Sequence, residues 1–593
     1  MASGSAEGQQ PDGCLGLEDI EIAQSDDSCD ATRRLAEGIF RRTFTHQQQV
    51  TNLIHNGADP NREIGLRVRG SGSDGWRYRL LSLAIDNLSD NAMWTGEVTD
   101  SNGGLQPFAA LPHWSSPELE AVIINSLIDG GARVNRPALS DDRPIKMAIR
   151  LGNEEAVRVL LAHGAPVRPP DGPLLIMELP KSVSDDRIGQ QVSLAYEQRL
   201  LSIYRRLILH DATLATERDL ISSACSNELG RYSQAFIDSY LDLLVDNGAN
   251  VTAVDAYGCS YLHKAAGVVF GDGAPCMADN LCRHLLPADI NRETRFNPNE
   301  TPLYVAGDQL DLSFEILEDD DRDEWEKNQA TRKIPLYETI IRSLLRSGAD
   351  IGRIPTDTEH DRRFRDLVLP HCTTVLNTDV HTGAMAAVNA ALAPQRSLAA
   401  FLMRSLPTLL PHLLQPPGTP AADPPPAPLP APPGYGPHEA EAIGWRIAAM
   451  CFDQDAANEA ITANIVIRHS DMARRVCAAV DHFIKSALYA SSNREVVGGT
   501  ANVGGVTVRV PLQCFAIRAD SRPHQVVHTR GRVGVREVVQ RARLDEAARH
   551  GIQEGAINKG FNDHLGNEDC QYGGWQQLGR IDERGQWVTL GIN

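Results

Sequence analysis

Residues 142–167 read DRPIKMAIRLGNEEAVRVLLAHGAPV and predict two short helices. Pro144 suits the first turn of a helix, because the N–H that proline lacks has no intrahelical partner there. Ile145, Ala148 and Ile149 follow at the spacing i, i+3, i+4, which places them on one apolar face.

A second helix follows after a short break. Gly152 interrupts the first helix, and Glu154 and Glu155 then place negative charge at the positive end of the second one. Gly164 ends this helix in the left-handed conformation that glycine tolerates. The apolar face of the second helix consists of Val157, Leu160 and Leu161. Two such helices cannot bury their apolar faces alone, so the unit needs similar neighbours on both sides.

This stretch resembles an ankyrin repeat, whose pattern runs T-P-L-H-x-A-A and later V-x-L-L-L-x-x-G-A-x-V. The match runs from Arg143 to Val167 without a gap, although Lys146 replaces the histidine and Ile149 the second alanine. The resemblance implies an α-solenoid of stacked helix pairs.

Endings similar to that of the second helix recur along the chain. They are LIHNGADPN (53–61), LIDGGARVN (127–135), LLAHGAPV (160–167), LILHDATL (207–214), LLVDNGANV (243–251), LLPADIN (285–291) and LLRSGADI (344–351). The interval from Ala132 to Ala165 is 33 residues, the ankyrin length, and the other intervals are longer. We therefore expect divergent repeats with inserted loops, among them residues 95–116 and the acidic stretch 308–330.

The segments around the repeats differ in composition, and the predicted fold class is mainly α. Residues 1–30 are rich in Gly, Ser, Asp and Gln, which predicts a disordered leader. Divergent ankyrin repeats are expected over 31–376 and a helical cap over 377–414, because the last repeat must cover its apolar edge. A Pro-rich linker follows over 415–437. Residues 438–593 predict a smaller α+β domain of no recognised family.

Within that last domain the patterns change from helical to strand-like. Helical patterns over 438–452, 456–469 and 470–490 precede strand-like alternation around 505–519. Another helix is expected over 533–557, and a hairpin over 580–592.

Charge and cysteine content narrow the classes of function. The formal net charge of −20 argues against nucleic acid and anionic membrane surfaces as partners. No run of about 20 apolar residues predicts a membrane-spanning helix. The 11 scattered cysteines suit a reducing compartment with free thiols. An intracellular, soluble protein is expected, with no cofactor and an oligomeric state that the sequence leaves open.

The resemblance also implies a function, namely binding of a protein partner through the turn tips and inner helices. Mixed arginine, carboxylate and tyrosine side chains at the tips suit such a partner. Carried over to this chain, the tip residues are Asn61, Arg62, Asn135, Arg136, Asp141, Arg168, Asp255, Tyr257 and Arg292. The composition of the leader and the excess of arginine over lysine are similar to those of ankyrin-containing type III effectors of bacterial pathogens. This resemblance would place the protein in a host cell cytoplasm after secretion.

A zinc site is the first alternative chemistry. Cys259, His263, Cys276, Cys282 and His284 are ligand types at short spacings, but the spacings match no standard zinc finger. No metal is therefore predicted.

The second alternative is an effector enzyme whose repeats select a substrate. Cys514 lies on a predicted strand and could act as a nucleophile, with His524 or His528 as its base. Asp520 could orient that base, and His528 is the preferred partner. Because buried cysteine is also a common core residue, an interaction protein is favoured over an enzyme.

Overall fold

The computed structural model contains mainly helices. The residues that it describes are 16–23, 29–70, 76–86, 98–99, 105–106, 111–135, 143–168, 176–180, 191–217, 220–224, 229–267, 273–413, 437–488, 499–503, 506–510, 514–516, 525–527, 535–559, 579–581, 584 and 586–589. The chain forms two compact units, Met1–His284 and Leu285–Asn593. None of the predicted domain boundaries coincides with the boundary between these units.

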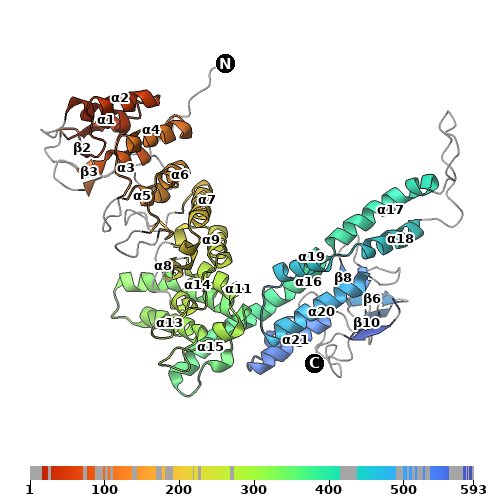
Figure 1. Cartoon of the computed structure of the whole chain (residues 1–593). Coiled ribbons are helices and arrows are strands. Elements are labelled where there is room, and N and C mark those ends of the chain that lie inside the picture. The colour runs from red at the N-terminus through yellow and green to blue at the C-terminus, as the bar shows by residue number, and fades with distance from the viewer. Residues whose placement is uncertain are drawn as a thin grey trace, which may run out of the picture. The chain divides into compact units, whose positions relative to one another are not determined.

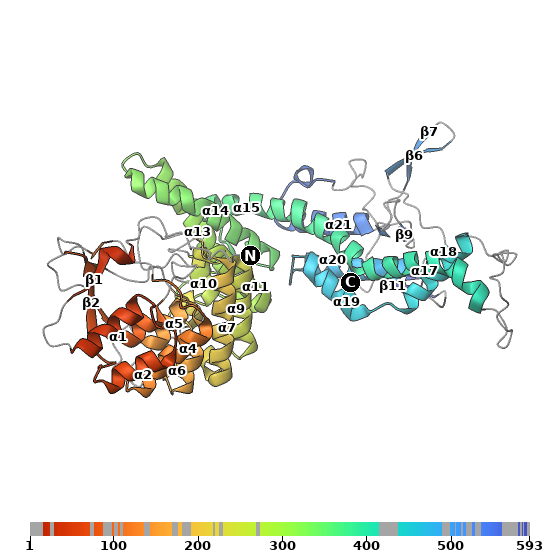
Figure 2. The same cartoon turned by 90° about the horizontal axis from the view of Figure 1, so that it is seen from above.

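Helices of the first unit pack as hairpins in two rows (Figures 1 and 2). They are α1 (Asp30–Phe40), α2 (Gln47–His55), α3 (Leu80–Ile85), α4 (Pro117–Asp129), α5 (Pro144–Arg150), α6 (Glu154–Ala162), α7 (Leu194–His210), α8 (Leu220–Ala224), α9 (Gln234–Asp246), α10 (Tyr261–Ala266) and α11 (Ala274–His284). One row contains α1, α3 and α5, and the other contains α2, α4, α6, α7, α9 and α11. Each helix in a row contacts the next, so the apolar faces are buried between neighbours.

The stretch 142–167 forms the expected helix pair, α5 and α6. Asn153 begins α6, and its side-chain oxygen accepts a hydrogen bond from the backbone N–H of Ala156 at 2.9 Å. Gly164 follows the helix with a φ of 74°, in the left-handed region as predicted.

The same chain reversal recurs after other helices in both units. At α4, Gly131 has a φ of 99°, and the N–H of Ala132 donates to the carbonyl of Leu127 at 2.8 Å. Equivalent alanine-to-leucine bonds join Ala58 to Leu53, Ala165 to Leu160, Ala249 to Leu244 and Ala349 to Leu344. This closure satisfies carbonyls at the end of the helix and turns the chain sharply.

A small sheet precedes and interrupts the helix pairs. Its strands are β1 (Ile20–Ile22), β2 (Glu63–Val68), β3 (Trp76–Arg79), β4 (Val98–Thr99) and β5 (Leu105–Gln106). The order is β1-β2-β4-β5, and β3 pairs with β2.

Two expectations are wrong at this sheet. Residues 16–23 belong to the stretch 1–30 predicted to be disordered, yet they form a turn and β1, in which Ile20 is fully buried against β2. The alternation of Ile20 and Ile22 with Glu21 has the period of a strand, and the polar composition around it conceals this. The loop predicted at 95–116 contains β4 and β5.

The second unit is also built mainly from helices. They are α12 (Pro287–Ile290), α13 (Pro302–Glu318), α14 (Glu324–Arg346), α15 (Glu359–Thr374), a π-helical turn (Val375–Val380), α16 (His381–Ala391), α17 (Ala393–Leu413), α18 (Pro437–Met450), α19 (Gln454–Asn464), α20 (Asp471–Leu488) and α21 (Val535–Arg549). Three antiparallel hairpins are formed by β6 (Gly499–Val503) with β7 (Val506–Val510), β8 (Cys514–Ala516) with β9 (Gln525–Val527), and β10 (Gly579–Ile581) with β11 (Trp587–Thr589). Short 3-10 turns in the two units are Leu17–Asp19, Ala212–Thr216, Leu229–Arg231, Ile351–Arg353 and Glu554–Ala556.

The acidic stretch 308–330 is helical, which corrects the loop predicted there. The helix α13 continues to Glu318, and α14 begins at Glu324. Asp323 caps α14, because its carboxylate accepts a hydrogen bond from the N–H of Glu326 at 2.7 Å. Carboxylates in the first turn of a helix stabilise it, so the acidic composition does not indicate a loop here.

The expected helical cap and the C-terminal helices pack together within this unit. The helix α16 contacts α19 and α20, and α17 contacts α18. Ala399 of α17 packs with Trp445 and Ala448 of α18 in a buried cluster. Apart from residue 437, the predicted linker 415–437 lies outside the described residues.

Arg543 attaches α21 to the π-helical turn. Its guanidinium is buried and donates to the carbonyl of Leu376 at 2.7 Å and to the side-chain oxygens of Asn377 and Asn558, each at 2.8 Å. The bonds to Leu376 and Asn377 join α21 to the π-helical turn.

No helix in the described part of the chain is long and apolar enough to cross a bilayer.

Gly131 offers a test of the helix closure. No atom lies within 4 Å of the position that a Cβ would occupy, so G131A changes only the backbone preference. We expect G131A to lower the free energy of unfolding by about 1–2 kcal/mol, and G131N by less, because asparagine tolerates the left-handed conformation better. Urea unfolding of the full chain measures both variants, and equal losses would contradict this account.

Candidate functional site

Asn61, a predicted contact residue, connects two loops of the first unit. Its side-chain amide donates to the carbonyl of Gly131 at 2.7 Å, and its oxygen accepts from the N–H of Arg133 at 2.8 Å. Both ends of the amide are therefore engaged within the protein. The structure assigns Asn61 a supporting role rather than the binding role expected.

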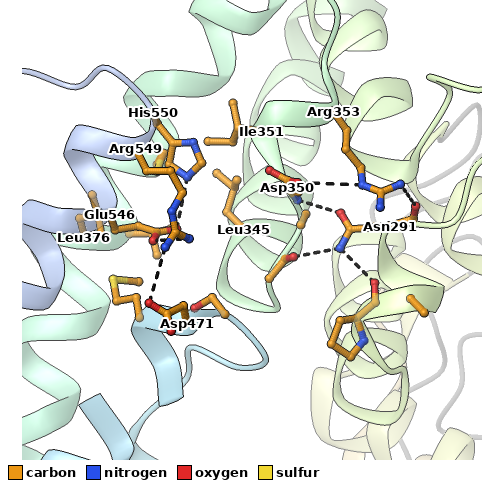
Figure 3. A pocket seen from close by; sticks show the side chains of 18 residues that line it. Asn291, Leu345, Asp350, Ile351, Arg353, Leu376, Asp471, Glu546, Arg549 and His550 are labelled. Atoms are coloured by element: carbon orange, nitrogen blue, oxygen red, sulfur yellow. Dashed lines mark hydrogen bonds and ion pairs between the residues drawn. The ribbon is translucent and has the colours of Figure 1, made fainter. Parts of the chain in front are cut away.

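Asn291 makes the same clamp in the second unit. Its amide donates to the carbonyl of Gly348 at 3.0 Å and its oxygen accepts from the N–H of Asp350 at 2.8 Å (Figure 3). Asn61 and Asn291 each lie three residues after an alanine in an A-D-x-N sequence. We call this two-bond arrangement the loop clamp.

Asn135 has the corresponding sequence position but makes no clamp. It lies three residues after Ala132 and is exposed. The loop of the next helix pair has Pro166 two residues after Gly164, where the clamp needs a backbone N–H. Proline lacks that donor, so one of the two bonds cannot form there.

The charged tip residues are engaged in local ion pairs. Arg168 pairs with Glu217 at 3.0 Å and with Asp211 at 3.3 Å, while Arg292 pairs with Asp289. These contacts hold the tips in place, and the arginines remain partly exposed at their outer surface. Of the other expected contacts, Arg62 is half-buried, and Arg136 and Asp141 lie outside the described residues.

A tight turn at residues 255–259 presents Tyr257. The carboxylate of Asp255 accepts hydrogen bonds from the N–H groups of Tyr257 at 2.9 Å and Cys259 at 3.0 Å. Gly258 has a φ of 84°, and Val254 bridges to Ser260 on either side of the turn. Tyr257 is 64% exposed, so this turn holds the backbone of an aromatic residue whose side chain reaches solvent.

The residues considered for zinc have other partners. The Nδ1 atom of His263 lies 2.8 Å from the hydroxyl of Ser260, and the Nε2 atom of His284 lies 2.8 Å from Asp242. Cys282 is buried.

A different group of ligand types occurs between α13 and α15. One ligand atom from each of Asp311, Glu315 and His360 lies within 4.8 Å of the other two. The guanidinium of Arg363 is 2.7 Å from the buried carboxylate of Asp311 and 3.5 Å from Glu315. A cation already pairs with these carboxylates, so the geometry favours an ion-pair cluster over a metal site.

The enzyme alternative involves residues that are only partly described. Cys514 begins β8, opposite Val527 of β9 in the antiparallel register. His524, His528 and Asp520 lie outside the described residues. A catalytic role for Cys514 stays a prediction.

The second unit contains a cavity of about 400 Å³ beside the second clamp (Figure 3). Residues of α12, the 348–353 loop, the π-helical turn and the facing ends of α20 and α21 line it. Charged groups at its wall are paired: Arg549 lies 3.5 Å from Asp471 and 3.0 Å from Glu546. The cavity is therefore polar on one side, with neutralised charges, and apolar toward Ile351 and Leu376.

This cavity brings together residue types that sequence reasoning overlooked. Cys372, His550 and Glu546 all line it, and the Nε2 atom of His550 lies 3.2 Å from Glu546. Burial, with a smaller effect of the Glu546 charge, raises the pKa of Cys372 to about 12. A thiol with that pKa is protonated at neutral pH and a poor nucleophile. The arrangement thus supports a binding cavity better than a catalytic one.

The comparisons with known proteins give no family assignment. No protein-family model matches the chain, and a search of curated proteins finds no significant match.

The loop clamp can be tested with three matched variants. We expect N61A and N291A each to lower the free energy of unfolding by about 1–2 kcal/mol, because each deletes two hydrogen bonds between loops. N135A removes the same side chain where no clamp exists and should change stability by less than about 0.5 kcal/mol. Calorimetry of the full-length variants measures the difference, and a loss with N135A equal to that with N61A would argue against the clamp.

Thiol labelling tests the protonation state in the cavity. Cys29 is exposed, and a hydrogen bond with the Thr32 hydroxyl lowers the pKa of its thiol. Since the thiolate is the reacting form, iodoacetamide at pH 7.5 should label Cys29 at least about 100-fold faster than Cys372. Mass spectrometry follows both sites, and T32V should slow the labelling of Cys29 alone. Comparable labelling rates at the two cysteines would contradict this account and indicate that Cys372 is a reactive nucleophile.

Proposed function

We propose that this chain is a divergent ankyrin-repeat protein that binds another protein through the exposed tips of its helix-pair loops. The observation that carries the proposal is the repeated closure of a helix by a left-handed glycine and an alanine, seen after α2, α4, α6, α9 and α14. The hairpin packing in two rows supports the same interpretation. An array of this kind exposes its loops along one edge, where a partner can contact several at once.

Tyr257 is expected to contribute most of the binding free energy at the tips. Its side chain is largely exposed, and the Asp255 turn holds its backbone before any partner arrives. A turn whose backbone is ordered beforehand costs little entropy on binding, and tyrosine is enriched among residues that dominate interface energies. Arg168 and Asn135 are expected to add peripheral contacts.

A protein fits this surface better than a nucleic acid. The tip arginines Arg168 and Arg292 are already paired with carboxylates, so they offer little uncompensated positive charge to a polyphosphate backbone. Translocation as a type III effector remains a separate hypothesis, resting on the leader composition, and a secretion assay with the full chain tests it.

The binding role is tested by quantitative capture from eukaryotic cell extract with the full chain as bait. Y257A should reduce recovery of the specific partners at least about tenfold, as expected for a residue that contributes about 1.4 kcal/mol or more. W325A is the matched control, because Trp325 is similarly exposed at 69% but lies in the first turn of α14 and not in a loop that follows a helix pair. Equal recovery with wild type and Y257A, or equal losses with Y257A and W325A, would contradict binding through this tip.

A further inference from the structure

The first helix pair contains a cleft that neither the repeats nor the tip contacts explain. It has a volume of about 630 Å³ and lies between α1 and α2. The helix α1 packs against α2 and α3, and α2 packs against α1 and α4, so this pair begins both rows among the described helices. A terminal repeat has one face without a helical neighbour, and that face requires either a polar surface or a cover.

The floor of the cleft is apolar. Phe44 is 7% exposed, and its ring lies so close to Gly38 that a Cβ on Gly38 would be 2.2 Å from its Cζ atom. Leu53 of α2 is half-buried beside it. The floor offers an apolar seat rather than an exposed ring for base stacking.

The rim of the cleft is basic although the chain as a whole is acidic. Arg33, Arg34 and Arg41 border it, with Glu37 as the acidic residue of the rim. Arg41 pairs with Glu37 at 2.8 Å. Arg34 is exposed and, within the described residues, has neither an ion pair nor a hydrogen bond.

Arg33 is also available to a ligand, although it forms an ion pair within the protein. Its partner is Asp30, and both side chains are more than half exposed, at 57% and 65%. Exposed pairs of this kind contribute little, so a ligand carboxylate can replace Asp30 at small cost. Across the cleft, Asn52 of α2 and Asn56, which follows the helix, supply amides that can bond a peptide backbone.

We propose that this cleft binds an acidic segment of a partner protein, with one apolar side chain seated over Phe44 and carboxylates paired with Arg33 and Arg34. This inference rests on the proposed protein-binding function and extends it to a second contact with a defined chemistry. Charge complementarity selects the acidic segment, and the apolar floor distinguishes a peptide from a free anion. At physiological ionic strength the distant acidic residues of the chain are screened beyond about 8 Å, so the local arginines dominate.

The test uses the full chain and short fluorescent peptides at 150 mM salt. One peptide has a leucine flanked by glutamates, a second has glutamines in place of the glutamates, and a third has glycine in place of leucine. We expect the first to bind at least about tenfold more tightly than either of the others, as measured by fluorescence anisotropy. Equal binding of the glutamate and glutamine peptides, or no binding of the first, would overturn the proposal.

Charge reversal locates the contact. R33E/R34E should weaken binding of the first peptide at least about tenfold, whereas R205E/R206E, at two exposed arginines on α7, should leave it unchanged. Equal weakening by the two variants would assign the effect to overall charge and refute the cleft. Y257A should not affect the peptide, so failure of the cleft and failure of the tip contact give different results.

Discussion

The structure depends on a single backbone requirement, namely that the chain reverses direction within three residues after a helix. A left-handed residue makes this possible, and glycine supplies it without the steric cost that a Cβ brings. The alanine that follows returns its N–H to a leucine carbonyl one turn back, so a polar group at the end of the helix is satisfied. With its ends fixed in this way, a short helix can present its apolar face to the next pair at a constant height.

That requirement also explains what could be predicted from the sequence. The G-A endings and the i, i+3, i+4 apolar spacing depend on nearest neighbours, and α5 and α6 form where those patterns place them. The extension of α13 and α14 was not predictable from composition, because acidic residues suit both a solvated loop and the first turn of a helix. Pairing of β1 with β2 depends on a partner more than 40 residues away, which no local pattern reveals.

The candidate sites also divide into features that follow from the local sequence and features that depend on distant segments. Residue type alone makes Asn61 and Arg168 suitable for a partner, but whether an amide or guanidinium is already engaged depends on a loop elsewhere in the sequence. The cavity beside the second clamp is lined by residues from distant segments of the sequence, so no local motif predicts it. They include Asn291, Cys372, Asp471 and Glu546. Tyr257 was predictable, because the D-x-Y-G turn that exposes it is local.

Pro166 makes the joints between neighbouring helix pairs differ in stiffness. Where Asn61 clamps the 131–133 loop, two hydrogen bonds resist sliding of one helix pair over the next. At the joint after Asn135 the proline removes one donor, so adjoining pairs are coupled there by side-chain packing without this loop bond. Bending of the array to follow a curved surface is therefore expected to cost less at that joint than at the joint that Asn61 clamps.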